Sequence, residues 1–201
     1  MATPALGLLG PFGIALGAVL LLKAADDAAN ERRRKQAALD AYWTRRRQRA
    51  HEAVLGIAKR IKALANLHSL PPFVQRPGSR NAWVQHGIIS YDPDWIMELL
   101  ETYCSDTECN TSVVVGIIAH ELGHWIHGDD CDIQTHPWHM EYRADGWAAW
   151  VLASMGIASS HFECVLATID RHGGPNHPPG PARARRIRVL YWRWLGYEVA
   201  A

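Results

Sequence analysis

Cysteine is scarce in this chain of 201 residues, which holds only four copies. They stand at Cys104, Cys109, Cys131 and Cys164, and no two are two or three residues apart, so the spacing of a zinc ribbon is excluded. A bridge between Cys104 and Cys109 is expected in an oxidising compartment, whereas free thiols are expected in a reducing one. A metal site in this chain has to be sought among its histidines and carboxylates.

Basic residues are almost missing from the middle of the chain. Residues 81–170 carry 14 acidic side chains and one basic one, whereas residues 23–80 carry 14 basic and 5 acidic ones. This change of sign near residue 80 predicts a basic arm joined to an acidic body. The arm contains no nucleic-acid-binding motif and no interleaving of basic and aromatic residues, so no nucleic-acid partner is expected.

Residues 2–22 contain no charged side chain at all. A helix of about 21 residues, rising about 1.5 Å per residue, just spans the apolar core of a bilayer, so residues 1–22 are predicted to form a single-pass membrane anchor. Basic residues follow this run and none precedes it, which predicts a cytoplasmic body. Two alternatives stay open: a cleaved signal peptide with a secreted or periplasmic body, and an apolar helix packed on the body.

Proline is absent from residues 23–68 and glycine occurs there once, in a stretch rich in Ala, Arg, Lys, Gln and Leu. This composition predicts a long helix. Its first half is polar on nearly every face, but its second half carries a core-packing stripe at helical spacing. The stripe consists of Val54, Ile57, Ala58, Ile61, Leu64 and Ala65. The three prolines and the glycine of "SLPPFVQRPGSR" then break the helix and mark the boundary between an arm of residues 23–70 and a body of residues 71–201.

The start of the body predicts a small sheet or hairpin. "NAWVQHGIISYDP", residues 81–93, contains β-branched and aromatic residues around one glycine, which predicts one or two short strands. "DPDWIMELLETYC" then returns to helical spacing. Large aromatic side chains dominate protein cores, so four tryptophans of the body are expected in its core. They are Trp83, Trp125, Trp147 and Trp150.

The stretch "GIIAHELGHWIHGDD", residues 116–130, places two histidines and a glutamate in an apolar helical context. On a helix His120 and His124 leave the same face one turn apart and can close on one metal ion. Glu121 stands beside them, where a general base for a metal-bound water belongs. Without a metal the two histidines would be costly buried polar groups, because apolar residues cover the other faces of the helix. These are Val113, Val114, Val115, Ile117, Ile118 and Ile126.

A third ligand is needed for a catalytic zinc. The metzincin pattern fits poorly, because His127 stands where that pattern has glycine and Asp130 where it has the last histidine. "EYRAD" follows a helix-start signal at Pro137 and places Glu141 and Asp145 on one face of a second helix. This spacing predicts Glu141 as the third ligand and Asp145 as the group that orients a ligating histidine. Small residues on this helix allow it to approach the first one closely: Ala144, Gly146, Ala148 and Ala149.

Residues 81 to about 190 resemble the catalytic domain of a gluzincin family of zinc metallopeptidases, that of the CAAX prenyl endopeptidase and the HtpX-like heat-shock proteases, in its small single-domain form. Four pieces match in order: "NAWVQHGIIS", "HELGH", "EYRAD" and "NHPPGPARARRI". The resemblance implies a mostly helical α+β, zincin-like domain with a small sheet, here preceded by a long N-terminal helix. It also implies Zn²⁺ held by His120, His124 and Glu141, with Glu121 as base and Asp145 behind the ligands. The segment between the two metal helices is short, so the many-spanning membrane chamber of the prenyl endopeptidases is absent.

The expected function is zinc-dependent endopeptidase activity on a peptide or protein substrate. The oxyanion of such a reaction needs a further donor, and the candidate is His177 in the late His-Pro loop, with Tyr142 as the alternative. His127, His136 and His139 receive no role, and the sequence does not indicate an oligomeric state.

Two other classes of protein stay open. One is a metal-binding but inactive chaperone or adaptor, and the other is a membrane-tethered interaction protein that works through its basic helix. An intact Glu121 argues against the first, because an inactive domain has no need of the base.

Overall fold

The computed structural model describes residues 11–102, 109–169 and 171–198. The chain divides into two compact units, residues 1–45 and residues 46–201. Helix α1, Pro11–Leu64, belongs to the first unit up to Arg45 and to the second from Arg46 onward. The predicted long helix is therefore present, and it starts earlier than the expected residue 23.

The first unit is a highly exposed part of α1. Nearly all its described side chains, from Val19 onward, are exposed, and pairs one helical turn apart join them, such as Glu31 and Lys35 at 2.7 Å. Among the described residues, no helix contains a stretch long and apolar enough to cross a membrane. Residues 1–10 of the predicted anchor lie outside the described part of the chain, so the anchor stays a prediction.

The second unit begins with the packing half of α1. Val54, Ala58 and Ile61 are fully buried, which confirms most of the predicted stripe. The exceptions are Leu64, with 38% of its surface exposed, and the half-buried Ala65. The helix ends at Leu64 and the chain turns away at Asn66, whose φ is 50°, so Leu64 is the last residue of the helix.

Three short strands form one sheet in the order β1-β3-β2. β2 (Ala82–Gln85) and β3 (Ile88–Tyr91) form an antiparallel hairpin, as predicted. Its two turn residues, His86 and Gly87, both have positive φ, which suits a tight turn between twisted strands. β1 (Phe73–Gln75) pairs with β3 in parallel.

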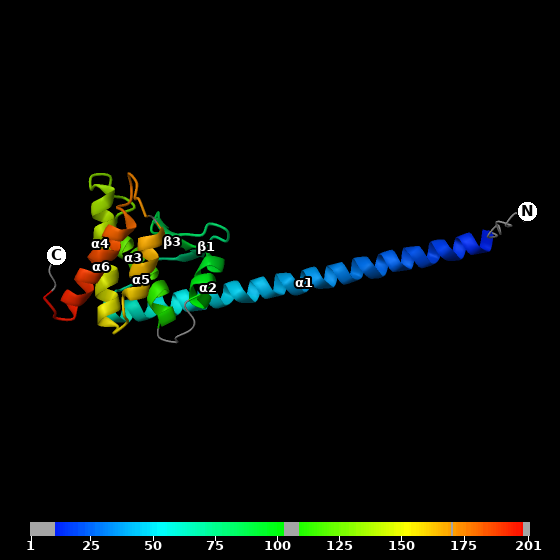
Figure 1. Cartoon of the computed structure of the whole chain (residues 1–201), viewed down its shortest axis with the longest axis horizontal. Coiled ribbons are helices and arrows are strands. Elements are labelled where there is room, and N and C mark those ends of the chain that lie inside the picture. The colour runs from blue at the N-terminus through cyan, green and yellow to red at the C-terminus, as the bar shows by residue number, and fades with distance from the viewer. Residues whose placement is uncertain (1–10, 103–108, 170, 199–201) are drawn as a thin grey trace, which may run out of the picture. The chain divides into compact units, whose positions relative to one another are not determined.

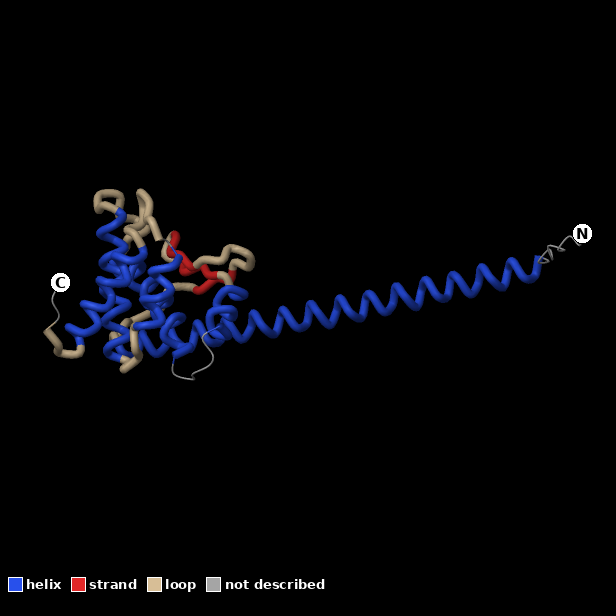
Figure 2. Tube along the Cα trace, viewed as in Figure 1, coloured by secondary structure: helices blue, strands red, loops and turns tan. Residues whose placement is uncertain are grey.

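The sequence analysis missed β1, which lies in the stretch predicted only as the boundary of the body. This strand exists because β3 supplies hydrogen bonds to the backbone on both sides of it: Ile89 N donates to Pro72 O, and Arg76 N donates to Tyr91 O. Since β3 lies in the centre, β2 is left at the free edge of the sheet, which Figure 2 draws in red.

Besides α1, the described residues of the second unit form five helices. They are α2 (Pro93–Thr102), α3 (Cys109–His127), α4 (Pro137–Ser154), α5 (Ser160–Ile169) and α6 (Gly180–Trp194). α3 packs against α2, α4, α5 and strand β2, so it is the central helix of this unit (Figure 1). α4 begins at Pro137, as predicted, and the side chain of His136 caps it by accepting a hydrogen bond from Trp138 N. A mostly helical α+β arrangement with a small sheet is thus confirmed.

Small residues set the distance between α3 and α4. A Cβ atom added at Gly123 would lie 2.9 Å from the Cα atom of Ala144 and 3.1 Å from the Cβ atom of Trp147. Only glycine fits at such a separation from a neighbouring backbone. The close approach predicted from the small residues of α4 is therefore present, and it brings the first turn of α4 beside the histidines of α3.

Candidate metal centre

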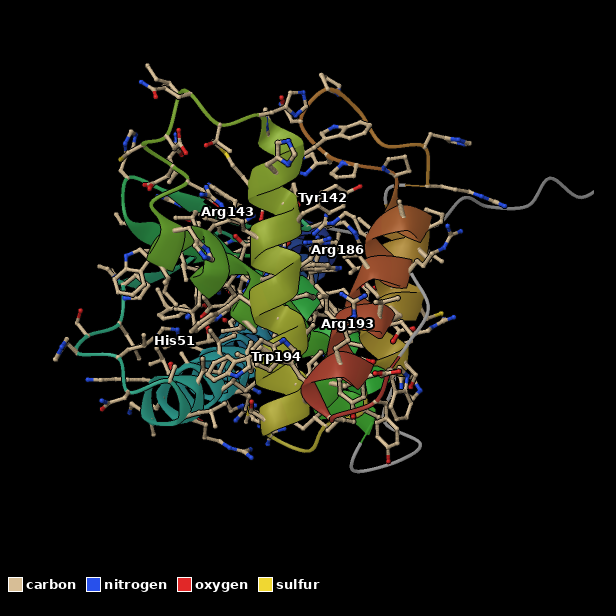
Figure 3. The ribbon with its side chains drawn as sticks, turned by 90° about the vertical axis from the view of Figure 1, so that its left-hand side faces the viewer. His51, Tyr142, Arg143, Arg186, Arg193 and Trp194 are labelled. Atoms are coloured by element: carbon tan, nitrogen blue, oxygen red, sulfur yellow. The ribbon has the colours of Figure 1, made fainter. Side chains whose placement is uncertain are left out.

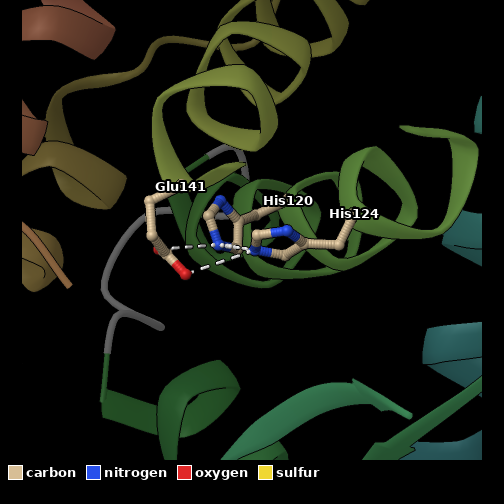
Figure 4. A group of neighbouring side chains, drawn as sticks. All are labelled: His120, His124 and Glu141. Atoms are coloured by element: carbon tan, nitrogen blue, oxygen red, sulfur yellow. Dashed lines mark hydrogen bonds and ion pairs between the residues drawn. The ribbon is translucent and has the colours of Figure 1, made fainter. Parts of the chain in front are cut away.

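The three predicted ligands come together at the junction of α3 and α4 (Figure 4). Nε2 of His120 lies 3.0 Å from Nε2 of His124. The carboxylate of Glu141 completes a triangle, with Oε2 3.4 Å from the first nitrogen and Oε1 3.4 Å from the second. Within the described part of the chain, this is the one group of three or more His, Cys, Asp or Glu side chains that is able to hold a metal ion.

These distances suit a tetrahedral zinc ion. Zinc–ligand bonds of about 2.0–2.1 Å at tetrahedral angles put neighbouring ligand atoms about 3.3 Å apart. Two imidazole nitrogens and one carboxylate oxygen are also a donor set that zinc accepts.

One oxygen of the cluster lacks a hydrogen bond. Oε2 of Glu141 is buried and accepts none from the residues that the structure describes, although it forms an ion pair with Arg183 Nη1 at 3.0 Å. A buried polar atom without a hydrogen bond is costly, and a bound cation would stabilise this oxygen together with Arg183. The residues present therefore fit the zinc ion that the resemblance implies.

Each ligating histidine is held from behind by a carboxylate. Asp145 Oδ1 lies 3.1 Å from Nδ1 of His120, and Asp129 Oδ2 lies 2.8 Å from Nδ1 of His124. A proton on each Nδ1, donated to these carboxylates, leaves the lone pair of each Nε2 directed at the partner histidine. Two lone pairs facing each other at 3.0 Å repel, so the two Nε2 atoms need a proton or a metal cation between them.

Asp145 was predicted for this role, but Asp129 was missed. Asp129 follows the end of α3 and is buried, because the chain reverses at Gly128, whose φ is 68°. Arg143 of α4 pairs with the other oxygen of Asp129 and holds it in place. The signal available in the sequence was an aspartate directly after the glycine that ends the helix, but the path of a turn cannot be inferred from spacing alone.

Arg183 of α6 is the second residue that the sequence analysis missed. Its Nε and Nη2 atoms donate to the two oxygens of Asp145 at 3.0 and 2.8 Å, and its Nη1 lies 3.0 Å from Glu141. Burial alone lowers the pKa of Arg183, but the two carboxylates outweigh burial and raise that pKa. The sequence did contain a signal for a buried role, because Arg183 falls on the buried stripe of α6 at helical spacing. That stripe contains Gly180, Arg183, Ala184, Ile187 and Tyr191.

The electrostatic environment of the cluster favours a bound cation. Burial and Arg183 lower the pKa of His120, but Asp145 and Glu141 outweigh them and raise that pKa to about 10. Burial alone raises the pKa of Glu141, whereas the facing imidazoles of His120, His124 and His177 lower it well below its usual range. The carboxylates therefore attract positive charge to the position between the two imidazoles.

Glu121 is buried and lies in the wall of a cavity beside the cluster. Burial raises the pKa of its carboxyl group, and the imidazoles of His120 and His124 oppose that shift. A raised pKa makes a carboxylate a stronger proton acceptor, as a general base requires.

The cavity has a volume of about 860 Å³ and is bounded by two unlike walls. One wall is the free edge strand β2, with residues 81–84. The other is the apolar side of α5, formed by Phe162, Leu166 and Ile169. Trp83 lines the cavity and is only half-buried, so its assignment to the core was wrong; an edge strand presents its side chains to the groove. Three further tryptophans pack against the core as expected: Trp125, Trp147 and Trp150.

His177 lies at the rim of this cavity, in the loop between α5 and α6. Its Nδ1 is 3.1 Å from Oε1 of Glu141, and 53% of its side chain is exposed. The loop is held to α4 by Trp138, whose indole N–H donates to the backbone oxygen of Gly174 at 2.9 Å. The arrangement brings the predicted oxyanion donor beside a predicted ligand.

Tyr142 is not brought to the cavity. Its ring lies under the guanidinium group of Arg186, 4.9 Å from the ring centre, on the side of α4 that faces α6 (Figure 3). Among the described residues that line the cavity, Tyr142 does not occur. This position removes the alternative oxyanion donor that the sequence suggested.

Several other histidines and cysteines lie away from the cluster. His127 bonds through Nδ1 to the backbone oxygen of Gly123 at 2.7 Å, and His139 is exposed. Cys131 and Cys164 are exposed free thiols. Cys104 and the side chain of Cys109 lie outside the described part of the chain, so a bridge between them stays a prediction.

No protein-family model, curated protein or solved structure matches this chain. The gluzincin resemblance stays a prediction, carried by the four sequence motifs.

Proposed function

We propose that the chain is a zinc-dependent endopeptidase of the gluzincin type, with the metal held by His120, His124 and Glu141. The observation that carries this proposal is the pair of facing Nε2 atoms 3.0 Å apart, with the carboxylate of Glu141 closing the triangle beside a cavity. When bound, zinc lowers the pKa of a water molecule toward about 7 and polarises the carbonyl of the scissile peptide bond.

Glu121 is the proposed general base. It lies on the cavity wall directly after a ligand in the chain, and burial raises its pKa, which makes its carboxylate a stronger proton acceptor. We propose that it takes a proton from the attacking water and passes it to the leaving amine. His177 at the rim donates a hydrogen bond to the oxyanion in this proposal.

The edge strand β2 supplies a binding mode for the substrate. No strand of the described part of the chain pairs with its outer backbone N–H and C=O groups, so an extended peptide can add to it as a further strand. A peptide bound along residues 81–84 would direct alternate side chains toward the wall formed by Phe162, Leu166 and Ile169. This wall favours an apolar side chain near the scissile bond.

The location of the chain is a further proposal. We propose that residues 1–22 anchor it in a membrane and that the second unit faces the cytoplasm, because basic residues follow the charge-free run and none precedes it. Cys131 and Cys164 are exposed and can report on this. A membrane-impermeant maleimide should label them only after lysis of the cells. Labelling of intact cells would contradict the orientation.

The activity is tested with the full chain, loaded with one equivalent of zinc and incubated with a peptide library. Wild-type protein should cleave peptides, and Glu121→Gln should bind zinc equally well but show no cleavage. If the zinc-loaded wild type cleaves none of the library peptides, the endopeptidase proposal fails and the inactive metal-binding adaptor is favoured. Equal cleavage by Glu121→Gln would instead remove Glu121 from the mechanism.

A further inference from the structure

Helix α6 contains five arginines and no carboxylate. Arg183 points inward to Asp145, on the buried stripe of the helix. At 100° per residue, the opposite face carries Arg185, Val189 and Trp192. The exposed arginines are Arg185, Arg186, Arg188 and Arg193. The helix is therefore basic on the side that faces away from the metal centre.

Exposed aromatic and aliphatic side chains follow at the C-terminal end of this helix. Trp192 is 41% exposed, Trp194 58%, Leu195 40% and Tyr197 60%. The rings of Trp192 and Tyr197 pack edge to face, with their centres 5.3 Å apart. Figure 3 shows Arg186 and Arg193 along the same helix, with Trp194 near its end. We call the exposed arginines together with these four residues the α6 surface.

Part of the positive charge of the α6 surface is uncompensated. Arg188 pairs with Glu163 at 2.8 Å, and Arg186 packs over Tyr142. Arg185 and Arg193 form no ion pair with any residue that the structure describes. A surface with free guanidinium groups beside exposed indole rings attracts an anionic partner that also accepts apolar side chains.

We propose that the α6 surface docks on an anionic lipid bilayer. Its arginines complement the negative headgroups, and its tryptophans and tyrosine are the side chains that favour the boundary between headgroups and acyl chains. The exposed Leu195 favours lipid over nucleic acid, because bases stack on aromatic rings but gain little from aliphatic side chains. The proposal depends neither on peptidase activity nor on residues 1–22.

Docking through this surface would place the metal centre close to the membrane. One side of α6 contributes Arg183 to the metal centre, and the opposite side would touch the headgroups. The metal centre and the headgroups are then separated by about 10–12 Å, the diameter of a helix with its side chains. Peptides that lie close to a bilayer would reach the cavity most easily.

The first test compares two charge-reversal variants of the full chain, and binding is measured by sedimentation with lipid vesicles. One type of vesicle contains phosphatidylcholine alone, and the anionic type contains phosphatidylcholine with about 30% phosphatidylserine. Arg185→Glu/Arg193→Glu should weaken binding to the anionic vesicles about tenfold or more. Lys59→Glu/Arg60→Glu is the matched control, because both residues are exposed on α1 of the same unit and the change in charge is equal. The control should stay within about twofold of wild type. Equal weakening by both variants, or none by the first, would overturn the proposal.

The second test measures protection of the α6 surface itself, because residues 1–22 can also bind lipid. Hydroxyl-radical labelling followed by mass spectrometry should show oxidation of Trp192 and Trp194 slowed by about threefold or more on anionic vesicles. The exposed His139 should be oxidised at its original rate. Unchanged tryptophan oxidation on bound vesicles contradicts the proposal. Protection of the tryptophans by duplex DNA in place of vesicles also contradicts the proposal. Protection by raised protein concentration without lipid contradicts it as well.

Discussion

The guanidinium group of Arg183 on α6 holds both carboxylate oxygens of Asp145 on α4, at 2.8 and 3.0 Å, while Asp145 faces Nδ1 of His120 on α3. Three helices are thereby joined through one buried carboxylate. The position of a proposed zinc ligand thus depends on a residue 63 positions later in the chain.

Replacing Arg183 should destabilise the fold. Arg183→Met removes the guanidinium group from the buried carboxylates of Asp145 and Glu141, so the free energy of unfolding should fall by about 3–5 kcal/mol. Arg183→Lys keeps the charge but loses the bidentate contact with Asp145, so its free energy of unfolding should lie between those of Arg183→Met and wild type. The exposed neighbour Arg185 is the control, since Arg185→Ala should change stability by no more than about 0.5 kcal/mol. Urea denaturation measures all three; equal stability of Arg183→Met and wild type would contradict the prediction.

Zinc content should depend on the carboxylate of Glu141. Purified wild-type protein should hold about one zinc per chain, and Glu141→Ala should lose most of it because a ligand is removed. Glu121→Gln should retain its zinc, since Glu121 is proposed as a base and not as a ligand. Elemental analysis after dialysis gives the result. Equal zinc in Glu141→Ala and wild type would remove Glu141 from the ligand set.

Two adjacent aspartates provide a sharper comparison. Asp129 faces Nδ1 of His124, whereas Asp130 accepts a hydrogen bond from the backbone N–H of Gly87 at 2.7 Å. Asp129→Asn should weaken zinc affinity about 10–100-fold, because the ligating imidazole loses the carboxylate that orients it. Asp130→Asn should leave zinc affinity within about twofold of wild type. Competition with a chelator measures both affinities, and a larger loss in Asp130→Asn would reverse the assignment.

The close approach of α3 and α4 makes Gly123 intolerant of a side chain. Gly123→Ala places a Cβ 2.9 Å from the backbone of Ala144, so we expect destabilisation of about 1–3 kcal/mol. Gly56→Ala on α1 is the counterpart, because nothing lies within 4 Å of its added Cβ. There the higher helix propensity of alanine should raise stability by about 0.5–1 kcal/mol. Thermal unfolding measures the stability of both variants. A Gly123→Ala variant as stable as wild type would mean that α3 and α4 are further apart than described.

The apolar wall of α5 should influence substrate choice, if the proposed peptidase activity holds. Ile169 lines the cavity yet is 59% exposed, so Ile169→Lys adds a charge at little cost to the fold. Apolar residues should then become less frequent, and acidic ones more frequent, at one position beside the cut site in a peptide library. Ile133→Lys is the control, because Ile133 is 96% exposed and does not line the cavity. Identical cleavage profiles for both variants would rule out this wall as a determinant of specificity.

Local patterns predicted most of the elements. The β2–β3 hairpin, the start of α4 at Pro137 and the packing stripe of α1 follow from periodicity and turn chemistry, which depend on near neighbours only. β1 was missed because three residues between prolines become a strand only when β3 is there to pair with them. Trp83 was misassigned because its environment depends on which strand lies at the edge of the sheet.

The sequence by itself determined that His120 and His124 share one helix face and that Glu141 and Asp145 share another, because the helical period is a local property of the chain. Only the tertiary structure decided that these faces meet, through the contact between Gly123 and Ala144. It also decided that Asp129 and Arg183 complete the surroundings of the ligands. Their roles depend on the reversal at Gly128 and on the packing of α6 against α4, which are long-range outcomes of folding that no residue spacing encodes.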